Sequence, residues 1–161
     1  MSNYIQTPPE EKEFIDKVIQ IKRVSKKTKG GNQISFTALI VSGDKKSKVG
    51  VGLGKAKSVT EAIQKGIKRA QKSLVEIPIV DDTIPAAIKF KFKGALVLLK
   101  PGRPGAGLIA GGPVRSVVEL AGIKNLASKI IGSKNKSVNV WATLKALQKI
   151  KKNWNKHESI K

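Results

Sequence analysis

The chain has 161 residues, of which 32 are Lys or Arg and 11 are Asp or Glu, so its formal net charge is +21. It has no cysteine, which excludes disulfides, zinc ribbons, iron–sulfur clusters and thiol nucleophiles. This excess of positive charge indicates a polyanionic partner, first nucleic acid and second an anionic membrane surface. Since no apolar run approaches the roughly 20 residues of a membrane span and the acidic start is unlike a signal or transit peptide, we expect an intracellular, soluble protein.

The first part of the chain predicts a tail, a helix, a strand and a loop. Residues 1–9 predict a flexible N-terminal tail, and residues 9–14 a short acidic helix. Residues 18–24 predict a first strand. Residues 25–31 predict a basic loop rather than a tight turn.

This loop lies in a stretch without acids. No Asp or Glu occurs between Asp16 and Asp44, and all Lys and Arg residues of the stretch lie before Gly30. A charge run is often only a solvated face. Clustered like charge on a loop is nevertheless poor for stability alone, so it favours a finger placed against phosphates.

Residues 30–56 are the stretch around which the chain is organised. Alternating side chains predict a strand over residues 32–42, followed by a polar hairpin loop. In the next strand, Gly50, Gly52 and Gly54 alternate with apolar residues. A strand face without side chains lets a helix or an RNA backbone come very close.

The same glycines resemble a nucleotide-binding loop, but the spacing fails. A P-loop needs a glycine where Val49 stands and a hydroxyl where Ala56 stands. A dinucleotide-binding fingerprint needs a third glycine where Lys55 stands. A glycine-faced strand is therefore the better interpretation.

The clearest helix covers residues 58–74. Ser58 and Glu61 have capping-box spacing, and the apolar residues share one face, which we expect to cover a three-stranded sheet. The opposite face is basic. Residues 10–77 therefore predict one domain, and residues 78–84, which begin with Pro78, a linker.

Residues 85–150 predict a second domain, followed by a basic C-terminal tail over residues 151–161. Its predicted elements, in chain order, are strands at 84–92 and 94–100, a turn-rich loop at 101–107, a helix from Pro113 to Gly122, a short strand at 123–126 and a helix at 137–150.

The helix that starts at Pro113 could meet an anion, since helix N-termini offer free N–H groups to phosphate. Arg115 lies in its first turn, where the helix dipole mildly disfavours a cation. Its position indicates either a partner anion, an acidic neighbour or simply an exposed arginine.

Catalytic and metal-binding constellations are absent from the sequence. No paired carboxylates, Ser/His/Asp set or metal-ligand cluster occurs, and the only histidine, His157, lies near the C-terminus. We therefore expect no enzymatic activity, no metal and no cofactor.

Several motifs occur in an order typical of a known family. They are Arg23-Val24-Ser25-Lys26, Lys29-Gly30-Gly31, Ser35-Phe36-Thr37-Ala38-Leu39, Val49-Gly50-x-Gly52-x-Gly54-Lys55-Ala56, Gly107-Leu108-Ile109-Ala110-Gly111-Gly112, Glu119-x-Ala121-Gly122 and Gly132-Ser133-x-Asn135. Over roughly residues 14–147 the chain resembles the universal, bacterial-type ribosomal protein S-five family of the small subunit.

The resemblance implies an α+β fold of two small α/β units. The first would be a double-stranded-RNA-binding-like α-β-β-β-α unit. The second would have a left-handed β-α-β crossover. The fold of this second unit would also occur in one domain of a translocation factor and in GHMP-type kinases, although the chain has no nucleotide site.

The resemblance also implies a structural constituent of the small (30S) ribosomal subunit in the cytoplasm. It would bind small-subunit (16S) rRNA and the neighbouring proteins S-four and S-eight. It would support decoding accuracy near the path by which mRNA enters. The loop over residues 24–32 matches the family loop near the spectinomycin site, and Gly107 and Arg115 match positions at the S-four interface.

The RNA-binding residues that we predict are basic or small residues of the first unit: Lys22, Arg23, Ser25, Lys26, Lys27, Lys29, Gly30, Gly31, Lys55 and Lys57. Lysines act as point charges for phosphates, and only four arginines occur, so we expect contacts to the RNA backbone. The competing hypotheses are a free-standing double-stranded-RNA chaperone and a nucleotide-using enzyme of the kinase-like fold.

Overall fold

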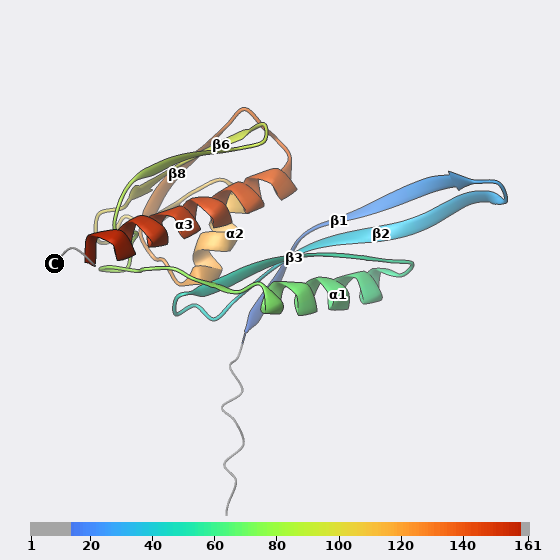
Figure 1. The fold of residues 1–161 in the computed structure, drawn as a ribbon, viewed down its shortest axis with the longest axis horizontal. Helices are drawn as coiled ribbons and strands as arrows, with labels where there is room; N and C mark the ends of the chain where they lie inside the picture. Colours follow the sequence, from blue (N-terminus) through green and yellow to red (C-terminus); the bar gives the residue numbers. More distant parts are fainter. Residues whose placement is uncertain (1–13, 159–161) are drawn as a thin grey trace, which may run out of the picture.

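The computed structural model describes residues 14–158, which form two four-stranded sheets and three helices (Figure 1). The predicted N-terminal tail and nearly all of the predicted acidic helix lie outside these residues. The elements are, in chain order, β1 Ile15–Thr28, β2 Gly31–Gly43, β3 Lys48–Ala56, α1 Val59–Lys72, β4 Val75–Glu76, β5 Ile88–Phe92, β6 Ala95–Pro101, β7 Leu108–Ile109, α2 Gly112–Ala121, β8 Leu126–Ile131 and α3 Lys136–Glu158.

The first sheet is antiparallel with the order β1-β2-β3-β4, and α1 packs on one of its faces. Ser58, predicted at the start of α1, is its N-cap, and its hydroxyl accepts the backbone N–H of Glu61 at 3.3 Å. The polar loop between β2 and β3 also lies where the sequence predicts it.

The prediction of a basic loop over residues 25–31 is wrong. β1 continues to Thr28, which pairs with Gly31, so only Lys29 and Gly30 remain in the turn. The Thr28 hydroxyl donates to the Gly31 carbonyl at 2.7 Å and closes this turn. Polar side chains on both faces of the ribbon hid the alternation that identifies a strand in sequence.

The second sheet has the order β5-β6-β8-β7, with β7 parallel to β8. Because α2 connects these two strands, the unit contains the expected β-α-β crossover. Gly122, where α2 was expected to stop, is its C-cap, with a φ of 91° in the left-handed region that favours glycine.

The short strand predicted over residues 123–126 is wrong, since β8 begins only at Leu126. The N–H of Ile123 bonds to the last turn of α2, and those of Lys124 and Asn125 donate to the Asp82 carbonyl at 2.9 and 3.0 Å. These residues therefore connect α2 to residues before the sheet instead of pairing within it.

The helix α3 continues to Glu158, whereas the sequence predicts a basic tail from residue 151. Ile150 is buried and Trp154 is half-buried beside Pro85 and Ile88. The Lys151 ammonium lies 3.4 Å from the Glu76 carboxylate. These contacts explain why α3 continues beyond residue 150, where the apolar pattern of the sequence predicts its end. No helix within residues 14–158 is both long and apolar enough to cross a membrane.

One hydrophobic core joins the two sheets. Leu39 and Val41 of β2 and Val49 and Val51 of β3 lie in the same buried cluster as residues of α2, α3 and the second sheet. The first sheet is therefore covered by α1 on one face and by the second unit on the other.

The segment predicted as a linker, residues 78–84, is folded against this core. Ile84 is 1% exposed, and Val80 and Thr83 exchange backbone hydrogen bonds at 2.9 and 3.0 Å. The Thr83 hydroxyl accepts the N–H of Gly102 at 3.1 Å.

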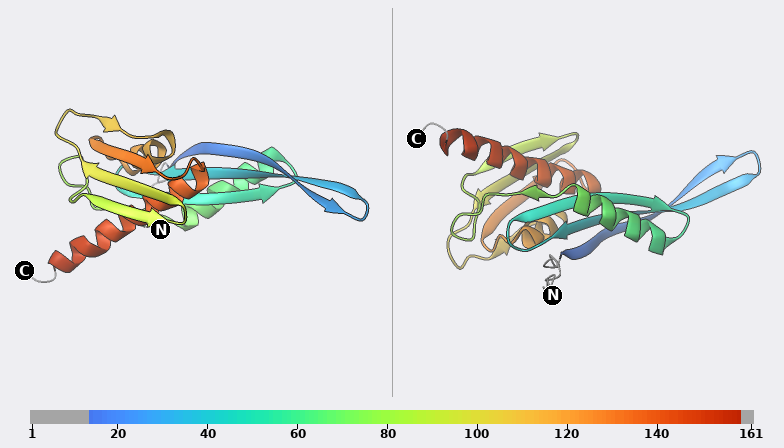
Figure 2. Two further views of the ribbon diagram at one scale, coloured as in Figure 1. Left: turned by 90° about the horizontal axis from the view of Figure 1, so that it is seen from above. Right: turned by 60° about the horizontal axis from the view of Figure 1, so that its bottom comes forward.

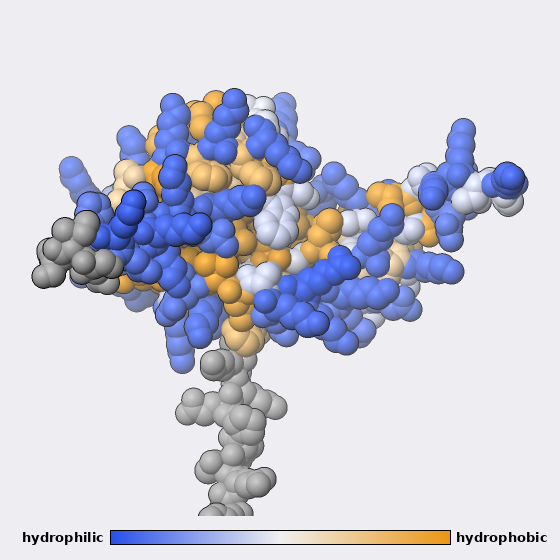
Figure 3. Space-filling view, in the orientation of Figure 1, coloured by the Kyte–Doolittle hydropathy of each residue, from blue (hydrophilic) through white to orange (hydrophobic). Residues whose placement is uncertain are grey.

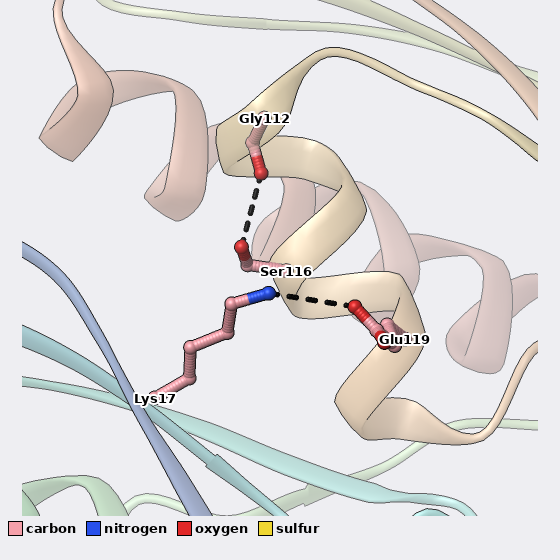
Figure 4. Close-up of polar contacts among 4 residues, drawn as sticks. All are labelled: Lys17, Gly112, Ser116 and Glu119. Atoms are coloured by element: carbon pink, nitrogen blue, oxygen red, sulfur yellow. Dashed lines mark hydrogen bonds and ion pairs between the residues drawn. The ribbon is translucent and has the colours of Figure 1, made fainter.

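An ion pair and a turn connect the outer parts of the two units. The Lys17 ammonium of β1 lies 3.4 Å from the Glu119 carboxylate of α2, beside the Ser116 hydroxyl that donates to the Gly112 carbonyl (Figure 4). In the β2–β3 turn, the N–H of Lys45 donates to the Leu120 carbonyl at 3.0 Å.

Candidate nucleic-acid interface

The distal part of β1 and β2 projects from the body of the protein as a two-stranded ribbon (Figures 1 and 2). The pairing of β2 with β3 ends at Phe36 and Ala56, whereas β1 and β2 continue to pair as far as Thr28 and Gly31. We call residues 22–35 of this ribbon the basic hairpin. It contains most of the RNA-binding residues predicted from sequence.

Both faces of the basic hairpin carry positive charge. Since side chains alternate along a strand, Lys22 and Lys26 lie on one face, and Arg23 and Lys27 on the other. All four side chains are exposed, and Lys29 lies at the turn. No acid occurs within the hairpin, so nothing in it offsets this charge.

The register adds a lysine from β3 to the first of these faces. Lys22 pairs with Thr37, which in turn pairs with Lys55, so the two lysines flank Thr37 on the same face of three adjacent strands. With neighbouring strands about 4.8 Å apart, their backbones lie about 10 Å from each other. Lys57 is also exposed, just before the N-cap of α1.

The other face holds a shallow hollow of about 230 Å³, lined by Arg23, Ser25, Asn32 and Ile34. Asn32 and Ile34 were not predicted as site residues. The signal that could have found them is the strand parity, because they pair with Lys27 and Ser25 across the ribbon.

Gly30 in the turn and Gly31 at the start of β2 place different demands on the residue type. Gly31 has a φ of +122°, which L-residues rarely adopt, whereas Gly30 has no atom near the position of a Cβ. Only Gly31 is therefore demanded by the backbone of the turn.

The close approach predicted for Gly50, Gly52 and Gly54 is made by α1. A Cβ on these residues would overlap the carbonyl oxygens of Ala70, Gly66 and Ala62, respectively. The glycine face is therefore covered by the helix and lies outside the surface open to RNA.

The exposed side of α1 extends the basic surface of the first unit. Lys65, Lys68 and Lys72 are exposed on it, and Glu61 is the single acid of this helix. Arg69 is engaged with the sheet, because its guanidinium donates to the Leu53 carbonyl at 2.6 Å. Figure 3 shows hydrophilic side chains along both α1 and the basic hairpin.

The only acid of the β2–β3 turn is held by backbone groups. Burial raises the pKa of Asp44, but the backbone N–H groups of Lys46, Lys48 and Ser47 outweigh it, and the pKa is lowered. These N–H groups donate to its carboxylate at 2.9, 2.9 and 3.0 Å. Asp44 therefore shapes the end of the sheet opposite to the basic hairpin.

Gly107 and Arg115 lie away from the basic hairpin, on either side of β7. Gly107 has a φ of +70°, and its N–H donates to the Asn125 side chain at 3.0 Å. Arg115 is exposed on α2, and its N–H makes the first hydrogen bond of that helix, to Gly111. Both residues are thus on a surface of the second unit.

Comparison with known proteins covers nearly the whole chain. Residues 14–78 match the family described as Ribosomal protein S5, N-terminal domain, and residues 90–156 match Ribosomal protein S5, C-terminal domain. Similar curated proteins are named small ribosomal subunit protein uS5. The one from Thermotoga maritima is 47% identical over 138 residues, which cover 86% of this chain and 78% of that protein.

Two further relatives carry the same name. The protein from Treponema pallidum (strain Nichols) is 50% identical over 130 residues, 81% of this chain and 75% of the relative. The protein from Chloroflexus aurantiacus is 48% identical over 142 residues, 88% of this chain and 80% of the relative.

Proposed function

Because this chain belongs to the ribosomal protein S5 family, we propose that it is a structural constituent of the small ribosomal subunit that binds 16S rRNA through the basic hairpin. The S5 family is structural and non-enzymatic, so its chemistry is that of binding. The observation that carries the proposal is the projecting ribbon with lysines on both faces and no acid.

The geometry suits insertion between RNA segments. A flat surface presents charge to one side, whereas the basic hairpin presents Lys22 and Lys26 to one side and Arg23 and Lys27 to the other. Each lysine that neutralises a phosphate releases counterions, so binding gains free energy that falls as salt rises. Lys29 at the turn would meet the backbone farthest from the protein body.

The hollow beside Arg23 gives the hairpin one place for a contact other than a phosphate. Arg23 and Asn32 offer several donors and one amide acceptor, and Ile34 offers an apolar floor. Such a set fits a sugar or the edge of an unpaired base. The lysines would position the ribbon, and this hollow would tune its fit.

The identities of individual partners are inferred from the family resemblance. The neighbouring proteins S-four and S-eight and the mRNA path are proposed partners, with Gly107 and Arg115 on the S-four side. Support for a protein contact there is the exposure of Arg115 on α2. A role in decoding accuracy would act through this surface.

Gradient sedimentation of a cell lysate at raised salt tests the proposal. The chain is followed by quantitative mass spectrometry, with subunit proteins as internal standards. We expect one copy per small subunit. A chain that stays at the top of the gradient and binds generic RNA duplexes would instead be a free-standing chaperone with the S5 fold.

A further inference from the structure

Within residues 14–158, no helix packs on the outer face of the second sheet. Ala95, Val97 and Leu99 of β6 are fully buried against α2 and α3. The residues between them, Leu96 and Leu98, therefore point to the opposite face, and they pack against neither of the two hydrophobic cores.

Further aliphatic side chains continue this face across the neighbouring strands. Ile131 of β8 pairs with Leu96 and is 47% exposed. Ile109 of β7, 62% exposed, pairs with Ala127 on the same side of the sheet. We call Leu96, Leu98, Ile109, Ala127 and Ile131 the outer-face patch. Figure 3 shows hydrophobic side chains at the top of the molecule, where Figure 1 places β6 and β8.

This composition is unusual for a solvated face. An antiparallel sheet with one face in water normally carries polar residues there. Here both outward positions in the middle of β6 are leucines, and a third large aliphatic side chain stands next to them. Contiguous exposed apolar surface of this kind marks an interaction site.

Lysines adjoin the patch on β5, β6 and β8, and one of them, Lys129, lies between Ala127 and Ile131 on β8. Lys89 of β5 and Lys129 of β8 flank Leu98 on the same row of the sheet, and Lys91 flanks Leu96. Lys100 pairs with Ala127. None of the four strands contains an Asp or Glu, so the rim has one sign of charge.

We propose that the outer-face patch binds a protein whose surface has an apolar centre and an acidic rim. A second copy of this chain is disfavoured, because it would bring two lysine rims together. RNA is disfavoured because the face offers no aromatic ring or arginine on which a base could stack. The leucines would be the buried centre and the lysines the polar rim of an ordinary protein interface.

This inference builds on the proposed function, because the partner is expected within the small subunit, and photo-cross-linking tests it. A benzophenone amino acid replaces Leu98 in one variant and Ile131 in a second, in case one position disturbs the sheet. Lysates are separated on a gradient, and whichever fraction holds the chain is irradiated. Each sample is then split, and one half is treated with ribonuclease before denaturing electrophoresis.

We expect a single, ribonuclease-resistant adduct with another protein, in which the linked peptide adjoins Asp or Glu residues. Adding Lys89→Glu and Lys129→Glu should lower the yield of this adduct about tenfold, because the new carboxylates would repel the acidic rim of the partner. The matched control, Lys152→Glu and Lys156→Glu, changes two exposed lysines of α3 that lie outside the patch and outside the basic surface of the first unit, and should leave the yield unchanged.

Three results would overturn the inference: a ribonuclease-sensitive adduct, an adduct between two copies of the chain, or no adduct from either position. The gradient position is read separately from the adduct. A chain that sediments with the subunit but gives no protein adduct refutes the patch alone, and a chain absent from the subunit refutes the proposed function.

Discussion

Gly52 of β3 lies against the carbonyl of Gly66 in α1, so strand and helix meet backbone to backbone. A Cβ on Gly52 would overlap this carbonyl and also approach the Ala70 nitrogen at 2.5 Å. Since backbone atoms on both sides cannot move aside cheaply, we expect Gly52→Ala to lower the free energy of unfolding by at least about 2 kcal/mol. Urea denaturation followed by circular dichroism measures this.

Gly30→Ala is the matched control for this substitution. Gly30 has nothing within 4 Å of a Cβ and no positive φ, so a change within about 0.5 kcal/mol is expected. Equal stability of the two variants would show that α1 does not press on β3 as closely as the structure places it.

The contrast between these glycines shows what the sequence could predict. Strict alternation of Gly50, Gly52 and Gly54 is a local pattern, so the bare strand face was predictable. The partner of that face was not, because a helix and an RNA backbone both suit it. Only the fold places Ala62, Gly66 and Ala70 over the three glycines.

The basic hairpin shows the opposite case. The sequence predicted that its charged residues form a binding site, but it did not predict that they lie on two paired strands. A ribbon exposed on both faces needs no apolar face, so the alternation that marks a strand is missing. The row formed by Lys22, Thr37 and Lys55 depends on register between distant strands. Register of this kind is set by pairing and turn geometry, which short-range patterns do not contain.

Asp44 should stabilise the β2–β3 turn only while it is ionised. Its folded-state pKa is lowered, so its contribution is fully present above the unfolded value of about 3.9 and is lost as the pH falls through the folded value. Asp44→Ala leaves three N–H groups without this acceptor, and we expect a loss of about 1–2 kcal/mol at neutral pH.

The pH dependence of this difference is the decisive measurement. Unfolding free energies of the wild type and Asp44→Ala are compared from pH 7 to pH 3. The gap should be constant above about pH 5 and shrink below about pH 4. A gap that persists unchanged at the lowest pH would mean that the carboxylate charge is not what holds the turn.

The Lys17–Glu119 ion pair should contribute little to stability, although it joins β1 to α2. Its side chains are 48% and 46% exposed, and exposed pairs are worth about 0.2–1 kcal/mol. A double-mutant cycle with Lys17→Met and Glu119→Gln should give a coupling near 0.5 kcal/mol that disappears at about 1 M salt. A larger coupling that persists at high salt would contradict this. It would mean that the ion pair, rather than the shared hydrophobic core, holds the two units together.

The strongest prediction concerns the distal basic hairpin, where Lys26, Lys27 and Lys29 are exposed. Changing all three to Ala should weaken binding to small-subunit rRNA and lower the slope of log K against log salt by about 2 to 3, because each lost phosphate contact removes about 0.7–0.9. Filter binding across a salt series measures the slope.

The control changes Lys89, Lys91 and Lys129 to Ala, which removes the same charge from the second sheet. If net charge alone governed binding, both variants would lose the same slope. A loss confined to the hairpin variant would instead assign the phosphate contacts to this ribbon, and an unchanged slope in that variant would remove its role.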